Sequence, residues 1–195
     1  MLTNLFGIPG RGALALAGFA LVLMFAVVLF PAVSARSGSP ANRVTDLQRA
    51  FTIDQFVGVL RRWSAMNPRA VGIIKYDAII RLDFVFPLLY GFALAFAYAA
   101  LSGRWQPAAF DRMFFTMPFA AAAFDFVENL LHLYLLRGIT NGRDVEAAAK
   151  RGAFNAAAIA IAWSAAHLKF AILLASLIGL AFAAGSRFFW IDHPE

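Results

Sequence analysis

The chain lacks cysteine and has few charged residues. With no cysteine among its 195 residues, disulfides, thiolate metal sites and cysteine nucleophiles are excluded. Only 14% of the residues are charged, whereas a typical soluble domain carries about 25%. No run of basic residues interleaved with aromatic ones supports nucleic-acid binding, so we assign the net charge of +6 to loop arginines that face anionic lipid. These shortages exclude a soluble domain of ordinary composition.

Apolar residues dominate instead, at 62% of the chain. A helical membrane crossing needs about 20 of them in succession. Four segments meet this requirement, at about 13–33, 78–101, 113–136 and 154–184. The fourth is longer than a bilayer requires, so it must tilt or project. We therefore predict an all-α polytopic membrane protein, with residues 1–195 forming a single membrane domain built as a four-transmembrane-helix bundle.

A fifth helix, amphipathic and short, is predicted at about 53–63 between the first two crossings. Thr52 and Gln55 have the spacing of a capping box, in which the two residues cap each other's backbone N–H groups. The apolar residues that follow share one helical face: Phe56, Val57, Leu60 and Trp63. We expect this helix to lie in the membrane interface as an anchor. The alternative is a lid over a cavity between the crossings.

The third crossing carries a polar stripe. At 100° per residue, Asp125, Glu128, Asn129 and His132 share one face of an otherwise apolar helix. Ionisable groups within a membrane are costly and face protein or water rather than lipid. The stripe therefore predicts which side of this helix points inward.

The second and fourth crossings also carry polar or aromatic candidates. Asp83 and Tyr90 are seven residues apart and share a face, while Trp163 and His167 are four apart on the fourth crossing. Pro87 lacks the N–H that would bond the carbonyl of Asp83, so we expect a kink there.

Depth arguments place these groups together. At about 1.5 Å per residue, antiparallel neighbouring helices bring five residues to one layer, near the side of the basic loops: Asp83, Glu128, Asn129, His132 and Trp163. Asp125 and His167 are expected deeper, as a floor. With Tyr90, these seven residues form the predicted ligand-binding set.

Catalytic candidates within this set are Asp83, Glu128 and His132. The three carboxylates of the set, Asp83, Asp125 and Glu128, repel one another if they lie close together, unless one is protonated or a cation lies among them. No HExxH-like spacing predicts a metal site, and we expect neither a metal nor a cofactor.

Two resemblances follow from these segments. The pairing of 83–90 (Asp-Phe-Val-Phe-Pro-Leu-Leu-Tyr) with 125–129 (Asp-Phe-Val-Glu-Asn) resembles a group of uncharacterised bacterial four-helix membrane proteins, which implies a bacterial inner membrane but no activity. The plan also resembles the EXPERA superfamily of sigma-2 receptor and sterol isomerase-like proteins. Its similar features are Asp46-Leu47-Gln48, Leu60 with Trp63, and Asp83 before a Phe-Pro-rich stretch. This second resemblance covers about residues 45–100 and implies a lipid- or sterol-like ligand gripped by carboxylates at Asp83 and Asp46.

Several functions remain open at this point. The first is binding of a lipid-like or cationic amphiphile, or of a partner subunit's helix or a second copy of the chain, through the acidic layer. The second is a membrane enzyme of the lipid or sterol isomerase type, with one carboxyl as general acid, another as base and His132 as a shuttle. Proton or cation translocation ranks third, because a pathway needs polar groups on both sides of the membrane. A structural or assembly subunit is the fourth. We favour binding over catalysis.

Orientation follows from the distribution of Lys and Arg. Loop 35–76 holds seven and loop 137–152 holds four, against four in total on the other side. This asymmetry predicts that both basic loops are cytoplasmic. Residues 33–35 (Val-Ser-Ala) also resemble a signal-peptidase site, but the long apolar stretch and the single charge before it, Arg11, favour a retained crossing.

Cysteine mapping tests this orientation, since the natural chain has no cysteine. A membrane-impermeant maleimide should label Ser102→Cys in intact spheroplasts, and should label Ala147→Cys only after the membrane is opened. The reverse pattern would contradict the predicted topology.

Overall fold

Every element that the structure describes is a helix. In this computed structural model, the described residues are 10–38, 43–101 and 108–189. Residues 39–42 of the predicted first loop and Ser102 lie outside them. The all-α prediction is confirmed for the described part of the chain.

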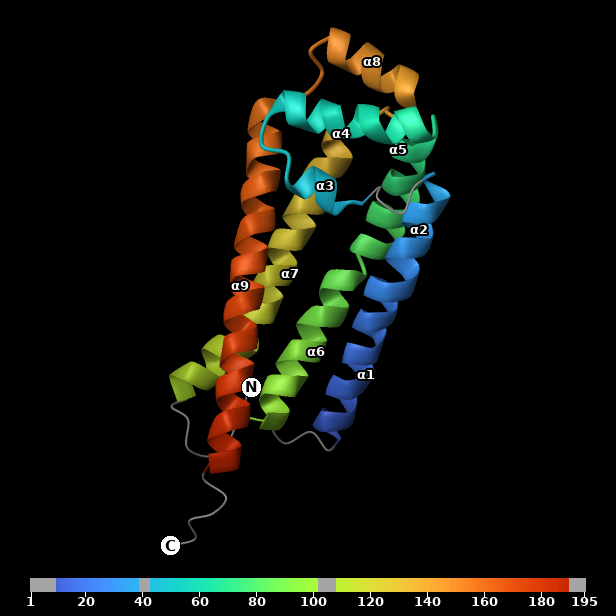
Figure 1. Cartoon of the computed structure of the whole chain (residues 1–195). Coiled ribbons are helices and arrows are strands. Elements are labelled where there is room, and N and C mark those ends of the chain that lie inside the picture. Colours follow the sequence, from blue (N-terminus) through green and yellow to red (C-terminus); the bar gives the residue numbers. More distant parts are fainter. Residues whose placement is uncertain (1–9, 39–42, 102–107, 190–195) are drawn as a thin grey trace, which may run out of the picture. The chain divides into compact units, whose positions relative to one another are not determined.

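Four helical stretches are long and apolar enough to cross a membrane (Figure 1). Their bounds are Arg11–Arg36, Ala70–Leu101, Phe110–Leu135 and Ala156–Gly185. The first stretch comprises α1 (Arg11–Met24), the π-helical η2 (Phe25–Leu29) and α2 (Phe30–Arg36). The second comprises α5 (Ala70–Ile73), the π-helical η3 (Ile74–Asp83) and α6 (Phe86–Leu101). The third and fourth lie in α7 (Ala108–Leu135) and α9 (Ala156–Phe189). The four predicted crossings are thus confirmed as helices.

The second stretch begins at Ala70, eight residues before the predicted start at 78. The predicted crossing left out residues 70–77 because this part of the chain contains the charged residues Lys75 and Asp77. Both side chains are nevertheless buried, and each has a partner outside this stretch: the Leu136 carbonyl for Lys75 and Arg36 for Asp77. Tertiary pairing therefore extends the helix beyond its apolar run.

Three short helices connect the long ones: α3 (Thr45–Gln48), α4 (Ile53–Met66) and α8 (Gly142–Lys150). The predicted capping box of α4 is confirmed. The Gln55 N–H donates to Thr52 Oγ1 over 3.2 Å, and the Thr52 N–H donates to Gln55 Oε1 over 3.3 Å. The helix starts as predicted and ends three residues later, at Met66.

The described helices contribute to two compact units. The first contains the described residues within 1–22, 87–123 and 168–195. Glycines permit close helix packing within it, because a Cβ at Gly18 would lie 2.8 Å from Cβ of Ala93, and one at Gly179 would overlap the ring of Phe114. Tyr98 donates a hydrogen bond to Asp111 Oδ1 over 3.1 Å.

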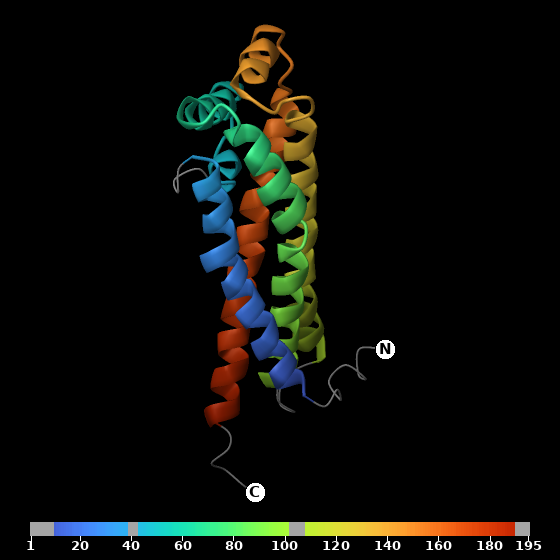
Figure 2. The ribbon, with the colours of Figure 1, turned by 90° about the vertical axis from the view of Figure 1, so that its right-hand side faces the viewer.

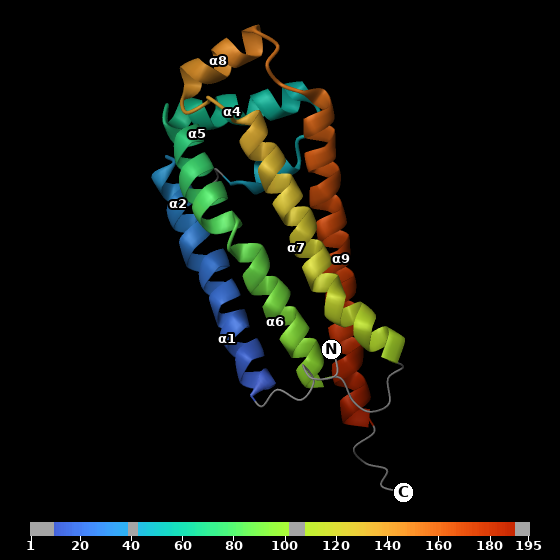
Figure 3. The same cartoon turned by 180° about the vertical axis from the view of Figure 1, so that it is seen from behind.

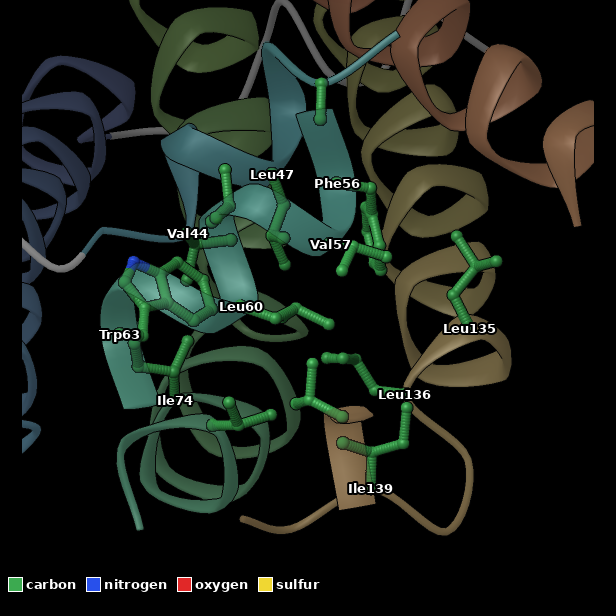
Figure 4. Close-up of a cluster of buried hydrophobic side chains, with 14 of the residues drawn as sticks. Val44, Leu47, Phe56, Val57, Leu60, Trp63, Ile74, Leu135, Leu136 and Ile139 are labelled. Carbon is green, nitrogen blue, oxygen red and sulfur yellow. The ribbon is translucent and has the colours of Figure 1, made fainter. Parts of the chain in front are cut away.

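The second unit contains residues 23–86 and 124–167. Its apolar core joins α3, α4, α5 and η3 to the end of α7, to α8 and to the start of α9. Figure 4 shows side chains from several of these helices gathered around Leu60. Leu60 and Trp63 of α4 are fully buried, and Phe56 is 1% exposed. The apolar face of α4 is therefore covered by protein.

Helix α8 packs on α4, as Figures 1 and 3 show from opposite sides. Arg61 Nε donates to Glu146 Oε1 over 2.7 Å, and Nη2 of the same arginine donates to Glu146 Oε2 over 3.0 Å. This bidentate pair raises the pKa of Arg61 and lowers the pKa of Glu146, chiefly through its hydrogen bonds. The backbone N–H of Thr140 lowers the pKa of Asp144, which closes a second capping box with Asn141 at the start of α8.

Helix α2 runs beside η3, as the blue and green ribbons of Figure 2 show. The rings of Phe30 and Phe86 meet edge to face with their centroids 5.5 Å apart. Phe25 stacks on the same Phe86 ring at 6.0 Å. These contacts join the end of the first long stretch to the second stretch.

The Gly72 backbone supports a prediction about stability. Its N–H donates to the Thr140 carbonyl over 3.0 Å, and a Cβ at this position would lie 2.8 Å from that oxygen. Gly72→Ala should therefore lower the melting temperature of the purified protein, because two backbone segments must separate.

Gly58→Ala is the matched control, since a Cβ at Gly58 meets nothing within 4 Å on an exposed face of α4. There we expect a neutral or stabilising effect of up to about 1 kcal/mol. Equal effects of the two substitutions would contradict the close approach.

Candidate functional site

The polar stripe of α7 is buried in the second unit. Asp125 is 2% exposed, Glu128 and Asn129 are 0% exposed, and His132 is 1% exposed. Their spacing places them on one face of the helix, and the apolar residues Val127 and Leu130 beside them are exposed. The inward direction predicted for the stripe therefore agrees with the burial of its side chains.

Asn129 links this stripe to the second long stretch. Its Nδ2 donates a hydrogen bond to the backbone carbonyl of Asp83 over 2.8 Å. In a continuous α-helix this carbonyl would accept from the N–H of residue 87, but that residue is proline and has no N–H. The helix is interrupted at Phe84 and Val85, as the proline predicts. The Asn129 amide thus satisfies the carbonyl that Pro87 leaves open.

Asp83 itself is 6% exposed and ends the π-helical segment η3. π-Helical turns are rare and occur often at functional sites. The hydrogen bond from Asn129 brings Asp83 against the stripe. The structure therefore brings two residues of the predicted layer, Asp83 and Asn129, into contact. Two more of its residues, Glu128 and His132, lie on the same face of α7 as Asn129.

Glu128 and His132 form a close pair within α7. Glu128 Oε1 lies 3.7 Å from His132 Nδ1. The ring of Phe56 from α4 stacks on the His132 ring, with 6.4 Å between centroids and 28° between planes. Helix α4 therefore covers the end of the stripe that is nearer the loops.

For three other predicted residues, the structure gives burial and neighbouring contacts. His167 is exposed, and its Nδ1 lies 2.8 Å from the Trp163 carbonyl. Trp163 is half-buried and its ring meets those of His167 and Phe51, at 4.0 Å and 5.0 Å between centroids. Tyr90 is buried on α6 in the other unit.

Lys75 is a buried charge that sequence reasoning counted as a loop residue. It is 9% exposed, and its Nζ donates to the carbonyl of Leu136 over 2.9 Å. That carbonyl lies just past the end of α7, where a positive charge is stabilised by the helix dipole. No local pattern indicates this contact, because the two residues are 61 apart in the chain.

Asp77 was also missed, and it holds two arginines. Asp77 Oδ2 lies 2.9 Å from Arg36 Nη2, and Oδ1 lies 2.9 Å from Arg81 Nη1. The spacing of Asp77 and Arg81 is the i, i+4 spacing of helical ion pairs. That spacing was the available signal, whereas the partnership with Arg36 required the fold.

Asp46, which the EXPERA resemblance matched to an acidic ligand position, pairs within the loop region. The indole Nε1 of Trp63 donates to Asp46 Oδ2 over 3.3 Å. Arg62 Nη2 lies 3.7 Å from the same oxygen. This carboxylate therefore helps to attach α3 to α4.

The chemistry of the buried group is that of carboxylates, one imidazole and one amide. Across the described ranges, no three His, Asp or Glu side chains meet in an arrangement that could hold a metal ion. Carboxylates in a low-dielectric site instead favour an organic cation or a proton.

No protein-family model, no curated protein and no solved structure matches the chain.

The hydrogen bond between Asn129 and Asp83 can be tested by a double-mutant cycle. Asn129→Leu should cost about 1–3 kcal/mol of unfolding free energy, because it leaves a buried carbonyl without a donor. In a Pro87→Ala background the loss should be markedly smaller, since residue 87 regains an N–H for that carbonyl. Reversible unfolding in mixed detergent micelles measures both values. Equal losses in the two backgrounds would show that the carbonyl is not the reason for the effect.

Proposed function

We propose that this chain is an integral membrane protein that binds the cationic head group of a lipid-like amphiphile through Asp83, Asp125 and Glu128. The observation that supports the proposal is the burial of these three carboxylates, none more than 6% exposed, within one compact unit. Ionisable groups within a membrane-spanning helix mark functional sites by default. A positive head group would be attracted to these carboxylates, and an alkyl chain would suit the apolar surroundings.

Asn129 adds support for a head group with N–H donors. Its Nδ2 is engaged by the Asp83 carbonyl, which also fixes the position of Oδ1 in the same planar amide. That oxygen is buried, and it has no hydrogen-bond donor among the described residues. An ammonium group has three N–H donors, so it could bind a carboxylate and this amide oxygen together.

Helix α4 would act as the cover of this site. Its Phe56 lies on His132, and its apolar face is buried in the protein core. An apolar face already covered by protein supports the lid over the alternative of a lipid-inserted anchor. The exposed Arg61–Glu146 pair attaches the same helix to α8, and exposed pairs of this kind contribute little stability.

A structural or assembly subunit is the second candidate. The bond from Asn129 to Asp83 and the bond from Lys75 to Leu136 both satisfy backbone carbonyls. Such contacts stabilise helix packing in a membrane without any ligand. On this reading, the buried polar groups only hold the helices together.

Matched probes separate the two candidates. Purified full-length protein in a non-ionic detergent is titrated with dodecylamine or with dodecanol, and the melting temperature is followed by tryptophan fluorescence. Binding of the ammonium should raise the melting temperature by a few degrees, whereas the uncharged alcohol should have little effect. Asp83→Asn and Glu128→Gln should each reduce the rise.

Asp54→Asn is the control, because Asp54 is an exposed carboxylate on α4. It should respond to dodecylamine as the wild type does. Equal responses to the two probes, or an undiminished rise in both site variants, would reject the binding proposal and favour the structural one.

A further inference from the structure

The Asp77 carboxylate holds together two arginines from different membrane-spanning stretches. Arg36 ends α2, and Arg81 lies on η3 one turn after Asp77. Each guanidinium takes a different carboxylate oxygen, and both distances are 2.9 Å. A single buried anion thus positions two cations side by side.

One carboxylate cannot satisfy two guanidinium groups. It offers about four acceptor sites, whereas the two arginines carry about ten N–H donors between them. The side chains of Arg36 and Arg81 are 65% and 72% exposed, and that of Asp77 is 11% exposed. The trio therefore has a net charge of +1 and presents its remaining donors outward. Planar guanidinium groups match the geometry of phosphate oxygens.

With the predicted apolar runs 13–33 and 78–101 in the hydrocarbon core, Arg36 lies just outside this core and Arg81 just inside its edge. The apolar run of the first stretch ends at Val33, three residues or about 4.5 Å before Arg36. The head-group layer on each side of the hydrocarbon core is about 5–7 Å thick. Arg81 lies one turn deeper, and its long side chain reaches back to Asp77, as basic residues near the interface do.

We propose that Arg36 and Arg81, held by Asp77, bind the phosphate of an anionic phospholipid. Free phosphate shares this chemistry, but the depth of the pair favours a phosphate that is anchored in the bilayer. This inference takes the apolar stretches to be inserted in a membrane. It is otherwise independent of the function proposed for the buried carboxylates.

Native mass spectrometry of the full-length protein in detergent tests the site. The probes are phosphatidylglycerol and phosphatidylcholine with identical acyl chains. A single net positive charge should favour phosphatidylglycerol by about fivefold at low ionic strength, and added salt should weaken this preference. The double variant Arg36→Gln with Arg81→Gln should lose the preference for phosphatidylglycerol.

Arg143→Gln is the matched control, because Arg143 is an exposed arginine on α8 outside the trio. It should keep the wild-type preference. Loss of the preference in this control, no preference in the wild type, or an unchanged preference in the double variant would each overturn the proposal.

Two further arms cover folding and the source of phosphate. If the double variant does not fold, the single variant Arg36→Gln replaces it, since it lowers the net charge of the trio from +1 to zero and leaves the Asp77–Arg81 pair in place. We expect this variant to lose the preference, and full retention would overturn the proposal. At constant ionic strength, replacing chloride with inorganic phosphate should leave the bound phosphatidylglycerol in place, and its displacement would assign the site to free phosphate instead.

Discussion

The hydrogen bond from Asn129 to the carbonyl of Asp83 resolves the central constraint on this fold. A proline at position 87 removes one backbone donor from a helix that is apolar enough to cross a membrane. In hydrocarbon an unpaired carbonyl costs several kcal/mol, so a broken helix persists only where another group supplies the donor. Asn129 supplies it from α7, and the carboxylate of Asp83 is drawn into the same buried region. The position of the candidate site thus follows from a backbone requirement.

The same principle governs the other polar groups of the second unit. Lys75 bonds a carbonyl beyond the end of α7, and Asp77 pairs with Arg36 and Arg81. Each of these side chains would be costly alone and is tolerated because it has a specific partner. The outcome is a segment from Ala70 to Asp83 that remains helical although its composition is mixed.

Much of the architecture could be predicted because its causes are local. The four apolar runs, the capping box at Thr52 and the break before Pro87 each depend on residues within a few positions of one another. The burial of the α7 stripe also followed from helical periodicity. By contrast, the same periodicity could not show that His167 is exposed. Its ring rests on the neighbouring Trp163, and burial depends on which helices lie opposite.

The amino-acid sequence by itself determined the helical class, the number of long apolar stretches and the polar face of α7. These properties follow from hydropathy and from the 3.6-residue period, which act along the chain. The tertiary structure decided the partners: Asn129 lies 46 residues from Asp83, and Lys75 lies 61 residues from Leu136. Such pairs form only when two helices present matching groups at the same height. Helix packing therefore brought Asp83 to Asn129 and brought Arg36 and Arg81 to Asp77. No local pattern in the sequence encodes the Asp83–Asn129 contact or the contact of Arg36 with Asp77.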